Sequence, residues 1–308
     1  MANQPPSEQT FRSYTTDQST QYAKYRQGYP PELFQHVLRH HTSTGGQLDT
    51  VVDVGCGPGP AIRGLAPHFQ HAIGLDASPS MIEAARDIGG TTANSEPIRF
   101  GISSAEDMGS QLDQPIPENS VDLIVASSAA HWFDMDKFWP RAAQVLKPGG
   151  TVAFWNRLTP RVDSSMPNHE AIQAAYDEWA KEYLIPYYAP GNFIEKGGYV
   201  DLVLPWSIKS PVLGFEEAGF RREIWQQDSD DGATMDMETL EKALSTISPV
   251  TRWREAHPDD VGTERDAARV LRRTLEKLLR ENGVEEGKEV LRQESPRVVV
   301  LIVKKFAS

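Results

Sequence analysis

The chain has 308 residues, with 31 Lys and Arg against 43 Asp and Glu, so its net charge is −12. This charge argues against nucleic acid or an anionic membrane as a partner, because both attract positive charge. The single cysteine, Cys56, excludes an intramolecular disulfide and a zinc site with several thiolates. The N-terminus lacks the pattern of a signal peptide, and the longest aliphatic run, six residues, is too short for a membrane span. We therefore expect a soluble, cytoplasmic protein, a monomer or weak homodimer, with one large domain and an insertion.

The first 45 residues divide into two parts. Residues 1–10 are polar and predict a disordered tail. Residues 11–45 carry aromatic side chains among polar ones, and Pro30 and Pro31 open a predicted helix over 32–41. This segment is too aromatic for a tail and too polar for a core strand. We expect it to form a helical lid that orders over a bound ligand.

Residues 46–155 alternate between apolar runs and helical patterns. Strands are predicted at 48–54, 72–75, 98–102, 121–126 and 151–155, and helices at 61–68, 79–88 and 138–146. The run at 121–126 is apolar throughout, as in a central strand that is buried on both faces. This alternation predicts an α/β fold with a doubly wound, mostly parallel sheet, whose ligand-binding core is formed by residues 46–155.

The alternation stops after Trp155. Residues 156–215 form a long, aromatic-rich segment, which we interpret as an inserted cap that binds the substrate. Residues 216–308 return to regular patterns, with strands predicted at 220–225 and 297–306 and helices at 237–246 and 265–282. These two strands would complete a seven-stranded sheet, with the C-terminal helices beside it.

A glycine-rich turn follows the first predicted strand, in the segment DVGCGPG at 53–59. Glycines at such a turn allow the backbone to approach a ligand closely. The dinucleotide-binding pattern requires glycine at position 60, which is Pro60, and the turn lacks the Gly-Lys-Ser/Thr of a P-loop. A tight turn without a ligand is the alternative interpretation.

Further residues with a possible binding role follow the later strands, at the edge where open α/β sheets bind ligands. They are Asp76, Met81, Ala105, Glu106 and Ser127. Asp76 ends the second strand, where a carboxylate can accept both ribose hydroxyls of a nucleoside. Met81 can pack on an adenine face, and the Ala105-Glu106 pair can meet its edge. Taken singly, each has an ordinary role, such as a helix cap or core packing. Their order along one edge favours a nucleoside site.

With these segments the chain resembles the class I S-adenosylmethionine-dependent methyltransferases over residues 11–155. The matching segments are DVGCGPG (53–59), LDAS (75–78), SSAEDM (103–108) and LKPGG (146–150). Other segments resemble the trans-aconitate methyltransferase-like group, which is similar to the gliotoxin-type thiol methyltransferases. These segments are YAKYRQGYP (22–30), AAHWFDMDKFW (129–139), LKPGGTVAFW (146–155) and STISPVTRWREAHPD (245–259).

The resemblance implies a Rossmann-like methyltransferase fold, S-adenosylmethionine as the cofactor and a small-molecule substrate. It implies that the glycine turn holds the amino-acid end of the cofactor and that Asp76 holds the ribose. Arg26 would pair with the cofactor carboxylate, and Gln27 replaces a proline that the family usually has. We interpret Cys56 as a packing residue of the turn. The implied cofactor-binding residues are Tyr22, Arg26, Asp53, Gly55, Cys56, Gly57, Gly59, Asp76, Ala77, Met81, Ala105, Glu106 and Ser127.

Methyl transfer from a sulfonium is an in-line displacement, for which the protein supplies alignment and a dry pocket. A general base is needed only where the acceptor is not already anionic. His131, near Asp134, is the one base close to the predicted site, and a structural histidine is the alternative. We therefore favour catalysis by alignment alone, on a thiolate or a carboxylate. The predicted acceptor pocket consists of His131, Trp132, Phe133, Arg157, Tyr187 and Trp253.

The expected function is thus S-methylation of a dithiol-type metabolite or O-methylation of a trans-aconitate-like carboxylate, in small-molecule or secondary metabolism. We expect no metal, because the sequence shows no cluster of metal ligands. Two other classes of protein are kept as alternatives. One is a nicotinamide- or flavin-dependent oxidoreductase on a similar fold, which Pro60 disfavours. The other is a regulatory protein that binds the cofactor without turnover.

Overall fold

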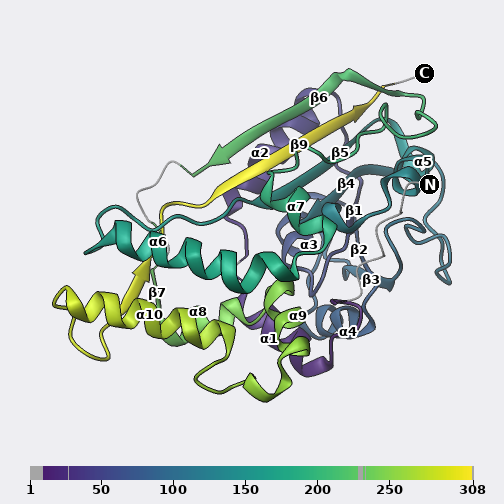
Figure 1. Cartoon of the computed structure of the whole chain (residues 1–308). Coiled ribbons are helices and arrows are strands. Elements are labelled where there is room, and N and C mark those ends of the chain that lie inside the picture. The colour runs from purple at the N-terminus through teal and green to yellow at the C-terminus, as the bar shows by residue number, and fades with distance from the viewer. Residues whose placement is uncertain (1–9, 27, 228–231, 233, 307–308) are drawn as a thin grey trace.

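The computed structural model describes residues 10–26, 28–227, 232 and 234–306. Most of the predicted tail, and Gln27, lie outside these residues. Seven strands form one sheet in the order β3-β2-β1-β4-β5-β9-β6 (Figure 1). They are β1 (Thr50–Val54), β2 (His71–Asp76), β3 (Arg99–Ile102), β4 (Val121–Ser127), β5 (Leu146–Arg157), β6 (Phe215–Gln226) and β9 (Arg297–Lys305). β9 alone runs in the direction opposite to the other six strands. The predicted doubly wound, mostly parallel sheet is therefore confirmed.

The sheet is covered on both faces because its strands are apolar on both sides. Alternate residues of β9 show this: Val298, Val300 and Ile302 pack in one core, and Val299, Leu301 and Val303 pack in the other. The first core is closed by α2 (Pro31–Ser43), α3 (Pro60–Leu65) and α4 (Pro79–Ile88), and the second by α5 (Met135–Val145). The chain leaves the sheet centre in opposite directions after β1 and after β4, which makes this pair the topological switch point.

The predicted elements of the core appear at nearly the predicted positions. The largest difference concerns the segment Lys147–Gly150, which we expected as a turn between a helix and a short strand. In the structure β5 begins at Leu146, which pairs with Val121, and the register shifts before the pairing continues at Leu123. Gly149 lies in the left-handed region at φ +78°, which allows this irregularity inside a strand.

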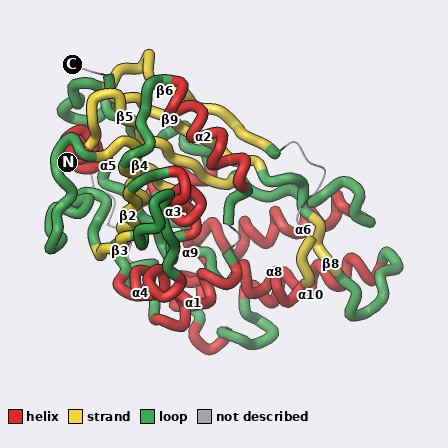
Figure 2. Tube along the Cα trace, turned by 180° about the vertical axis from the view of Figure 1, so that it is seen from behind, coloured by secondary structure: helices red, strands yellow, loops and turns green. Residues whose placement is uncertain are grey.

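A second, helical lobe lies beside the sheet (Figures 1 and 2). It contains α6 (His169–Trp179), α8 (Met237–Leu244), α9 (Ser248–Ala256) and α10 (Ala267–Glu281), with the strand pair β7 (Thr234–Asp236) and β8 (Val290–Arg292). Its own apolar core includes Ile172, Trp179, Leu240, Val250 and Leu275. The C-terminal helices that the sequence analysis placed beside the sheet therefore pack on the insertion.

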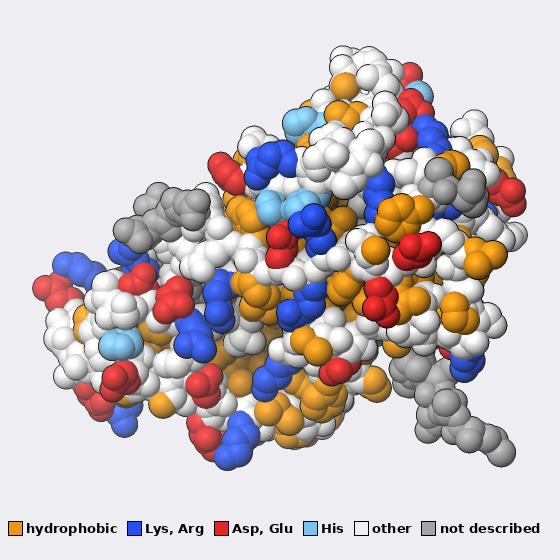
Figure 3. All heavy atoms as spheres, turned by 90° about the horizontal axis from the view of Figure 1, so that it is seen from above, with side chains coloured by type: hydrophobic (Ala, Val, Ile, Leu, Met, Phe, Trp, Pro, Cys, Tyr) orange, Lys and Arg blue, Asp and Glu red, His pale blue; other side chains and the backbone are white. Residues whose placement is uncertain are grey.

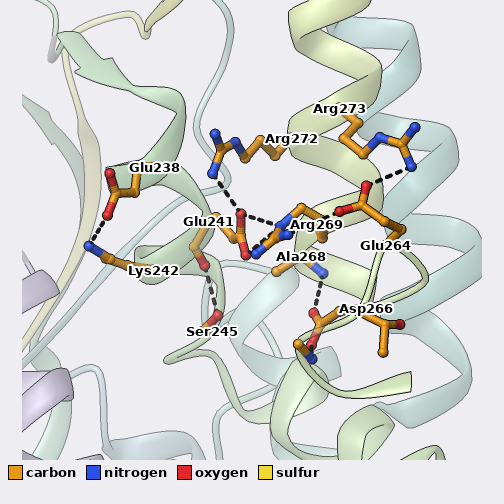
Figure 4. A network of polar contacts seen from close by, with 12 residues as sticks. Glu238, Glu241, Lys242, Ser245, Glu264, Asp266, Ala268, Arg269, Arg272 and Arg273 are labelled. Carbon is orange, nitrogen blue, oxygen red and sulfur yellow. Dashed lines mark hydrogen bonds and ion pairs between the residues drawn. The ribbon is translucent and has the colours of Figure 1, made fainter. Parts of the chain in front are cut away.

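Ion pairs join two helices of this lobe. Glu241 of α8 contacts Arg269 at 2.8 Å and Arg272 at 3.1 Å, both on α10 (Figure 4). Asp266 caps α10 by accepting the N–H of Ala268, and Arg254 of α9 binds the same carboxylate at 2.9 Å. These contacts fix α8, α9 and α10 relative to one another.

The remaining elements are short. They are α7 (Pro190–Lys196), 3₁₀ turns at Ala66–His68, Ala130–Trp132, Ile185–Tyr187 and Pro258–Asp260, and a π-helical turn at Ala180–Leu184. Within the part of the chain that the structure describes, no helix is long and apolar enough to cross a membrane.

The N-terminal segment, residues 10–26, contacts both the core and the helical lobe. Its helix α1 (Thr16–Tyr25) begins with a capping box between Thr15 and Gln18. Ser19 lies 2.8 Å from Ser80 of α4, in the core. On the other side, the Tyr14 hydroxyl contacts the carbonyl oxygen of Thr246 in the helical lobe at 3.4 Å. The first part of the predicted lid therefore lies between the core and the helical lobe, whereas α2, which we also assigned to the lid, packs on the sheet.

Candidate functional site

A cavity of about 740 Å³ lies at the carboxyl edge of the sheet, between the sheet, the N-terminal segment and the helical lobe. Residues from β2, β4 and the glycine turn after β1 line the cavity, together with residues from α1, α6, α7 and α8. Seen from above, the molecule shows a hollow with hydrophobic side chains inside and Lys and Arg side chains around it (Figure 3). This volume is sufficient for a cofactor or substrate of drug-like size.

Most of the residues predicted for the site line this cavity. They are Tyr22, Arg26, Gly55, Cys56, Gly57, Asp76, Ala77, Met81, Ala105, Glu106, Ser127, His131, Trp132, Phe133 and Arg157. Four predicted residues do not line it: Asp53, Gly59, Tyr187 and Trp253. The structure thus brings together residues from the N-terminal segment and from the ends of five strands, β1 to β5.

The glycine turn approaches the cavity because its backbone is left-handed. Gly55 has φ +68°, and a Cβ atom built there would lie 2.7 Å from Cβ of Ala129, so no side chain fits. Gly57 has φ +54°, but a Cβ there meets only the Tyr22 ring, at 4.0 Å. The backbone at Gly57 therefore leaves open a space that a side chain would fill.

Asp76 supports this turn from the end of β2. Its two carboxylate oxygens accept the backbone N–H groups of Gly57 and Ser78, each at 2.8 Å. Burial raises the pKa of Asp76, while these two hydrogen bonds oppose the rise. A carboxylate has about four acceptor positions, so oxygen lone pairs remain for a ligand in the cavity.

Asp53 lies beneath the turn instead of facing the cavity. It is fully buried, and its pKa is held well above the ordinary value by burial first and by the Asp76 carboxylate second. Burial also raises the pKa of Cys56 well above its usual value, with Asp53 adding to the rise. The Cys56 thiol therefore stays protonated, in agreement with a packing role.

The residues that follow β2 and β3 form an apolar wall with a polar edge. Met81 is 2% exposed and lines the cavity from the first turn of α4. Ala105 lies beside Glu106, whose Oε1 accepts the backbone N–H of Asp134 at 2.9 Å. Glu106 thereby connects the end of β3 to the start of α5, a contact that the sequence did not indicate.

Aromatic contacts close the cavity from the N-terminal side. The Arg26 guanidinium lies over the Tyr22 ring at 5.2 Å, and the Phe11 ring packs edge-on against Tyr22 at 5.9 Å and Trp132 at 6.4 Å. Burial raises the pKa of Tyr22, although the neighbouring Arg26 charge lowers it. Arg26 thus presents a positive charge at the cavity wall among phenol rings.

His131 is buried, and both of its ring nitrogens face protein groups. Nδ1 lies 2.9 Å from the Tyr199 hydroxyl, and Nε2 lies 3.8 Å from Oε2 of Glu195 on α7. Burial raises the pKa of Tyr199 well above its ordinary value, so its hydroxyl keeps its proton. The carboxylate of Asp134, which we considered a partner of His131, pairs with Lys137 at 3.0 Å.

The acceptor side of the cavity differs in part from the prediction. Arg157 lines the cavity, with its guanidinium 5.1 Å from the Tyr29 ring. Trp253 instead stacks on His257 at 4.5 Å inside the helical lobe, and Tyr187 contacts the same His257 ring. Residues that the sequence analysis missed take their place, namely Tyr29, Tyr176, Tyr188, Asn192 and Glu195. The signals in the sequence were the segment YAKYRQGYP (22–30) for Tyr29 and the aromatic composition of the insertion for the others.

Comparisons with known proteins agree with this architecture. Residues 52–154 match the family described as a methyltransferase domain. A solved structure described as a candidate type II methyltransferase from Anaeromyxobacter dehalogenans superposes with a TM-score of 0.56. The superposition covers 91% of this chain and 97% of that one, at 24% identity. It shows that the two proteins share a fold, the Rossmann-like methyltransferase fold.

Curated relatives match over part of the chain. A candidate S-adenosylmethionine-dependent methyltransferase of Saccharomyces cerevisiae, CRG1, is 31% identical over 172 residues, which is 55% of this chain and 55% of its own length. Methyltransferase AacuQ of Aspergillus aculeatus is 32% identical over 134 residues, covering 43% of this chain and 40% of its own. The chain therefore spans about half the length of the curated relatives it matches.

Proposed function

We propose that this protein is an S-adenosylmethionine-dependent methyltransferase that acts on a small-molecule metabolite. The observation that carries the proposal is the convergence of the glycine turn, Asp76 and the Ala105-Glu106 pair on one cavity, inside the segment that matches a methyltransferase domain. A nucleoside with an amino-acid tail fits this set, because the cavity offers a carboxylate, an apolar wall and a guanidinium. When bound, S-adenosylmethionine supplies an electrophilic methyl group on a sulfonium.

The residues present fit such a cofactor at each end. The open space beside Gly57 admits the amino-acid end next to the turn, and Arg26 offers a charge-assisted contact to its carboxylate. Asp76 would accept hydrogen bonds from the ribose hydroxyls. Met81 and Ala105 would enclose the adenine. Asp53 would act through the turn, because it lies below the cavity surface.

The acceptor is proposed to be a thiolate or a carboxylate, as in the thiol and trans-aconitate methyltransferase groups that the sequence resembles. The helical lobe and the insertion would form the acceptor cap, because Tyr176, Tyr188 and Glu195 reach the cavity from them. These residues make the acceptor side aromatic, which suits a compact, largely apolar metabolite. Glu195 places a carboxylate there, which repels a substrate with several negative charges, such as a tricarboxylate, more than a thiol with at most one charge on its sulfur.

The two alternative functions have less support from the site. Pro60 occupies the first position of α3, where the dinucleotide-binding pattern would require glycine. A regulatory protein without turnover would need no second wall, yet residues of α6, α7 and α8 extend the cavity beyond the proposed cofactor residues. Catalysis on a second, small molecule accounts better for this extension.

The proposed activity can be tested directly with a methyl-labelled donor. The purified chain is incubated with labelled S-adenosylmethionine and either a panel of dithiols or a panel of tricarboxylates, and products are identified by mass spectrometry. Labelled product in the dithiol panel supports S-methylation, and labelled product in the tricarboxylate panel supports O-methylation. Failure of the chain to bind the donor in calorimetry would contradict the proposal as a whole.

The proposed catalysis by alignment predicts a small effect of His131→Ala. Both nitrogens of His131 face protein groups, so the side chain is expected to shape the pocket instead of accepting a proton. The loss in kcat should stay well below the range of about 10²–10⁴-fold that is typical of a removed general base. Steady-state kinetics with the identified acceptor measures this loss.

Tyr199→Phe serves as the companion variant, because it removes the hydrogen bond to His131 but keeps the ring. It should have a similarly small effect, with cofactor affinity unchanged. A loss in the full general-base range for His131→Ala, relieved at high pH, would instead identify His131 as the base.

The position of the N-terminal segment predicts that it orders when ligand binds. Tyr22 and Arg26 line the cavity, and Ser19 and Tyr14 join the segment to α4 and to the helical lobe by polar contacts. Adding S-adenosylhomocysteine should therefore slow amide hydrogen exchange in residues 11–26. Exchange in α10, which packs away from the cavity, is the internal control. Equal exchange in the segment with and without ligand would exclude a lid.

A further inference from the structure

A cluster of two histidines and one glutamate lies outside the cavity, between α2 and β6. His36 and His40 are one helical turn apart on α2, so they occupy the same side of this helix. The adjoining face of α2 carries Leu33, Phe34 and Val37, which pack against the sheet. The two imidazole rings are 4.7 Å apart and only partly buried.

Glu223 completes the cluster from the edge strand of the sheet. It pairs with Val300 in the ladder between β6 and β9. Because side chains alternate along a strand, Glu223 shares its face with Trp225, which packs in the same core as Phe34 of α2. One Glu223 oxygen, Oε1, lies 2.5 Å from Nε2 of His36 and 3.1 Å from Nε2 of His40.

The three side chains therefore direct their ligand atoms at one point. The face seen from above in Figure 3 shows histidine side chains next to an acidic and a basic one. The helix and the strand set this arrangement, since the backbones of α2 and β6 are both fixed by packing on the sheet. Among the residues that the structure describes, this is the only group of three such side chains whose ligand atoms lie this close together.

We propose that His36, His40 and Glu223 form a binding site for a divalent cation of the zinc class, with water as a fourth ligand. Two imidazoles and one carboxylate are a ligand set that suits zinc, whereas magnesium and calcium prefer sites made of oxygen alone. Tetrahedral coordination with bonds of about 2.0–2.2 Å places ligand atoms roughly 3.3 Å apart. The three atoms lie within 4.8 Å of one another, so side-chain rotations of ångström size reach this geometry.

Two kinds of charge near the cluster affect the binding of a cation in opposite directions. The Glu223 carboxylate, whose Oε1 lies close to both imidazoles, attracts a cation. Arg221 lies on the same face of β6 as Glu223 and is exposed, so its positive charge weakens the attraction for a cation. Removing this charge should therefore strengthen binding.

An ion at this point would connect the helix that follows the N-terminal segment to the edge strand of the sheet. Edge strands are the part of a sheet that is open to unwanted pairing, and a link to α2 would hold β6 in place. An ion that binds only the folded chain raises its stability, and the gain grows with the logarithm of the ion concentration once this exceeds Kd. The proposed site is thus a structural clamp that is independent of the methyltransferase function.

The test uses the full chain without any affinity tag, freed of metal by chelation and dialysis. Calorimetric titration with Zn²⁺ should show one ion per chain, and Zn²⁺ should raise the Tm. His36→Ala, His40→Ala and Glu223→Gln should each weaken binding at least tenfold and remove the rise in Tm. Arg221→Ser should strengthen binding. His71→Ala is the matched control, because His71 pairs with Glu96 at 3.0 Å as a single, exposed imidazole.

Cobalt substitution gives a second readout, since tetrahedral Co²⁺ absorbs strongly in the visible range. The wild-type chain should show this spectrum, and Glu223→Gln should lose it while circular dichroism stays unchanged. Absence of saturable Zn²⁺ binding would overturn the proposal. Binding that all three ligand variants retain would mean an adventitious ion only, and would overturn it equally.

Discussion

Asp76→Ala is expected to weaken S-adenosylmethionine binding at least tenfold while the chain stays folded. The reason is that a carboxylate hydrogen-bonded to ribose hydroxyls contributes about 1.5–3 kcal/mol for each charge-assisted bond. A loss of about 1.4 kcal/mol already corresponds to a factor of ten in affinity. The variant also removes the acceptor for the N–H groups of Gly57 and Ser78, so the glycine turn loses support. Calorimetry with the cofactor measures the combined effect.

Two variants separate the contact to the ligand from the support of the turn. Asp76→Asn keeps an acceptor oxygen for the turn but loses the charge, so it should show a smaller loss of affinity. Asp122→Ala is the matched control: Asp122 is also buried and accepts a backbone N–H, that of Thr50 at 2.9 Å, at the start of β4 and away from the cavity. It should lower stability without changing affinity. Unchanged affinity in folded Asp76→Ala would refute the ribose assignment.

The α/β core could be predicted from the sequence because its signals are local. Each strand is a short apolar run and each helix has its own periodicity, so the order of elements sets the topology. The carboxyl ends of parallel strands meet at one edge, and this rule alone placed Asp76, Glu106 and Ser127 beside one cavity. The same rule does not say which side chain of a turn is exposed. Asp53 illustrates this, since it lies directly before the glycine turn but is fully buried and does not line the cavity.

The acceptor side could not be predicted, because long-range packing decides it. Tyr187 and Tyr188 are adjacent in the sequence, yet only Tyr188 lines the cavity, while Tyr187 turns toward His257. Trp253 belongs to a segment that resembles known methyltransferases but stacks inside the helical lobe. The helical lobe itself is assembled from two segments that lie on either side of β6 in the sequence. Aromatic composition indicates that such a lobe exists without indicating which ring faces the ligand.

The contact partners of individual side chains could not be predicted from the sequence either. The sequence indicated His131 as a site residue. Its hydrogen-bond partner Tyr199 lies 68 positions further along the chain and becomes a neighbour only in the fold. His36 and His40 have the spacing of ligands on a helix, whereas Glu223 is 187 positions away from His36. Spacing in the sequence can indicate two ligands on one helix. A third ligand from another element requires the structure.

Gly57→Val is expected to abolish cofactor binding with little change in secondary structure. The Cβ position at Gly57 is open within the protein, where only the Tyr22 ring approaches, at 4.0 Å. A valine side chain therefore fits the folded chain but projects into the space that the proposed cofactor needs. The left-handed backbone at φ +54° adds a conformational cost of about 1–2 kcal/mol for a residue with a side chain. Calorimetry for binding and chemical unfolding for stability measure the two effects separately.

Gly89→Val distinguishes steric exclusion of the ligand from backbone strain. Gly89 ends α4 at φ +71°, and a Cβ built there meets nothing within 4 Å. Gly89 does not line the cavity, so valine should cost similar stability there but leave cofactor affinity unchanged. Gly57→Ala should fall between wild type and Gly57→Val, because its single methyl group fills less of the space. If Gly57→Val kept wild-type affinity, the turn could not be the surface that holds the cofactor. If Gly89→Val lost affinity to the same extent, strain in the core would explain both variants. Loss of binding at Gly57 alone would therefore identify the turn as a direct contact of the cofactor.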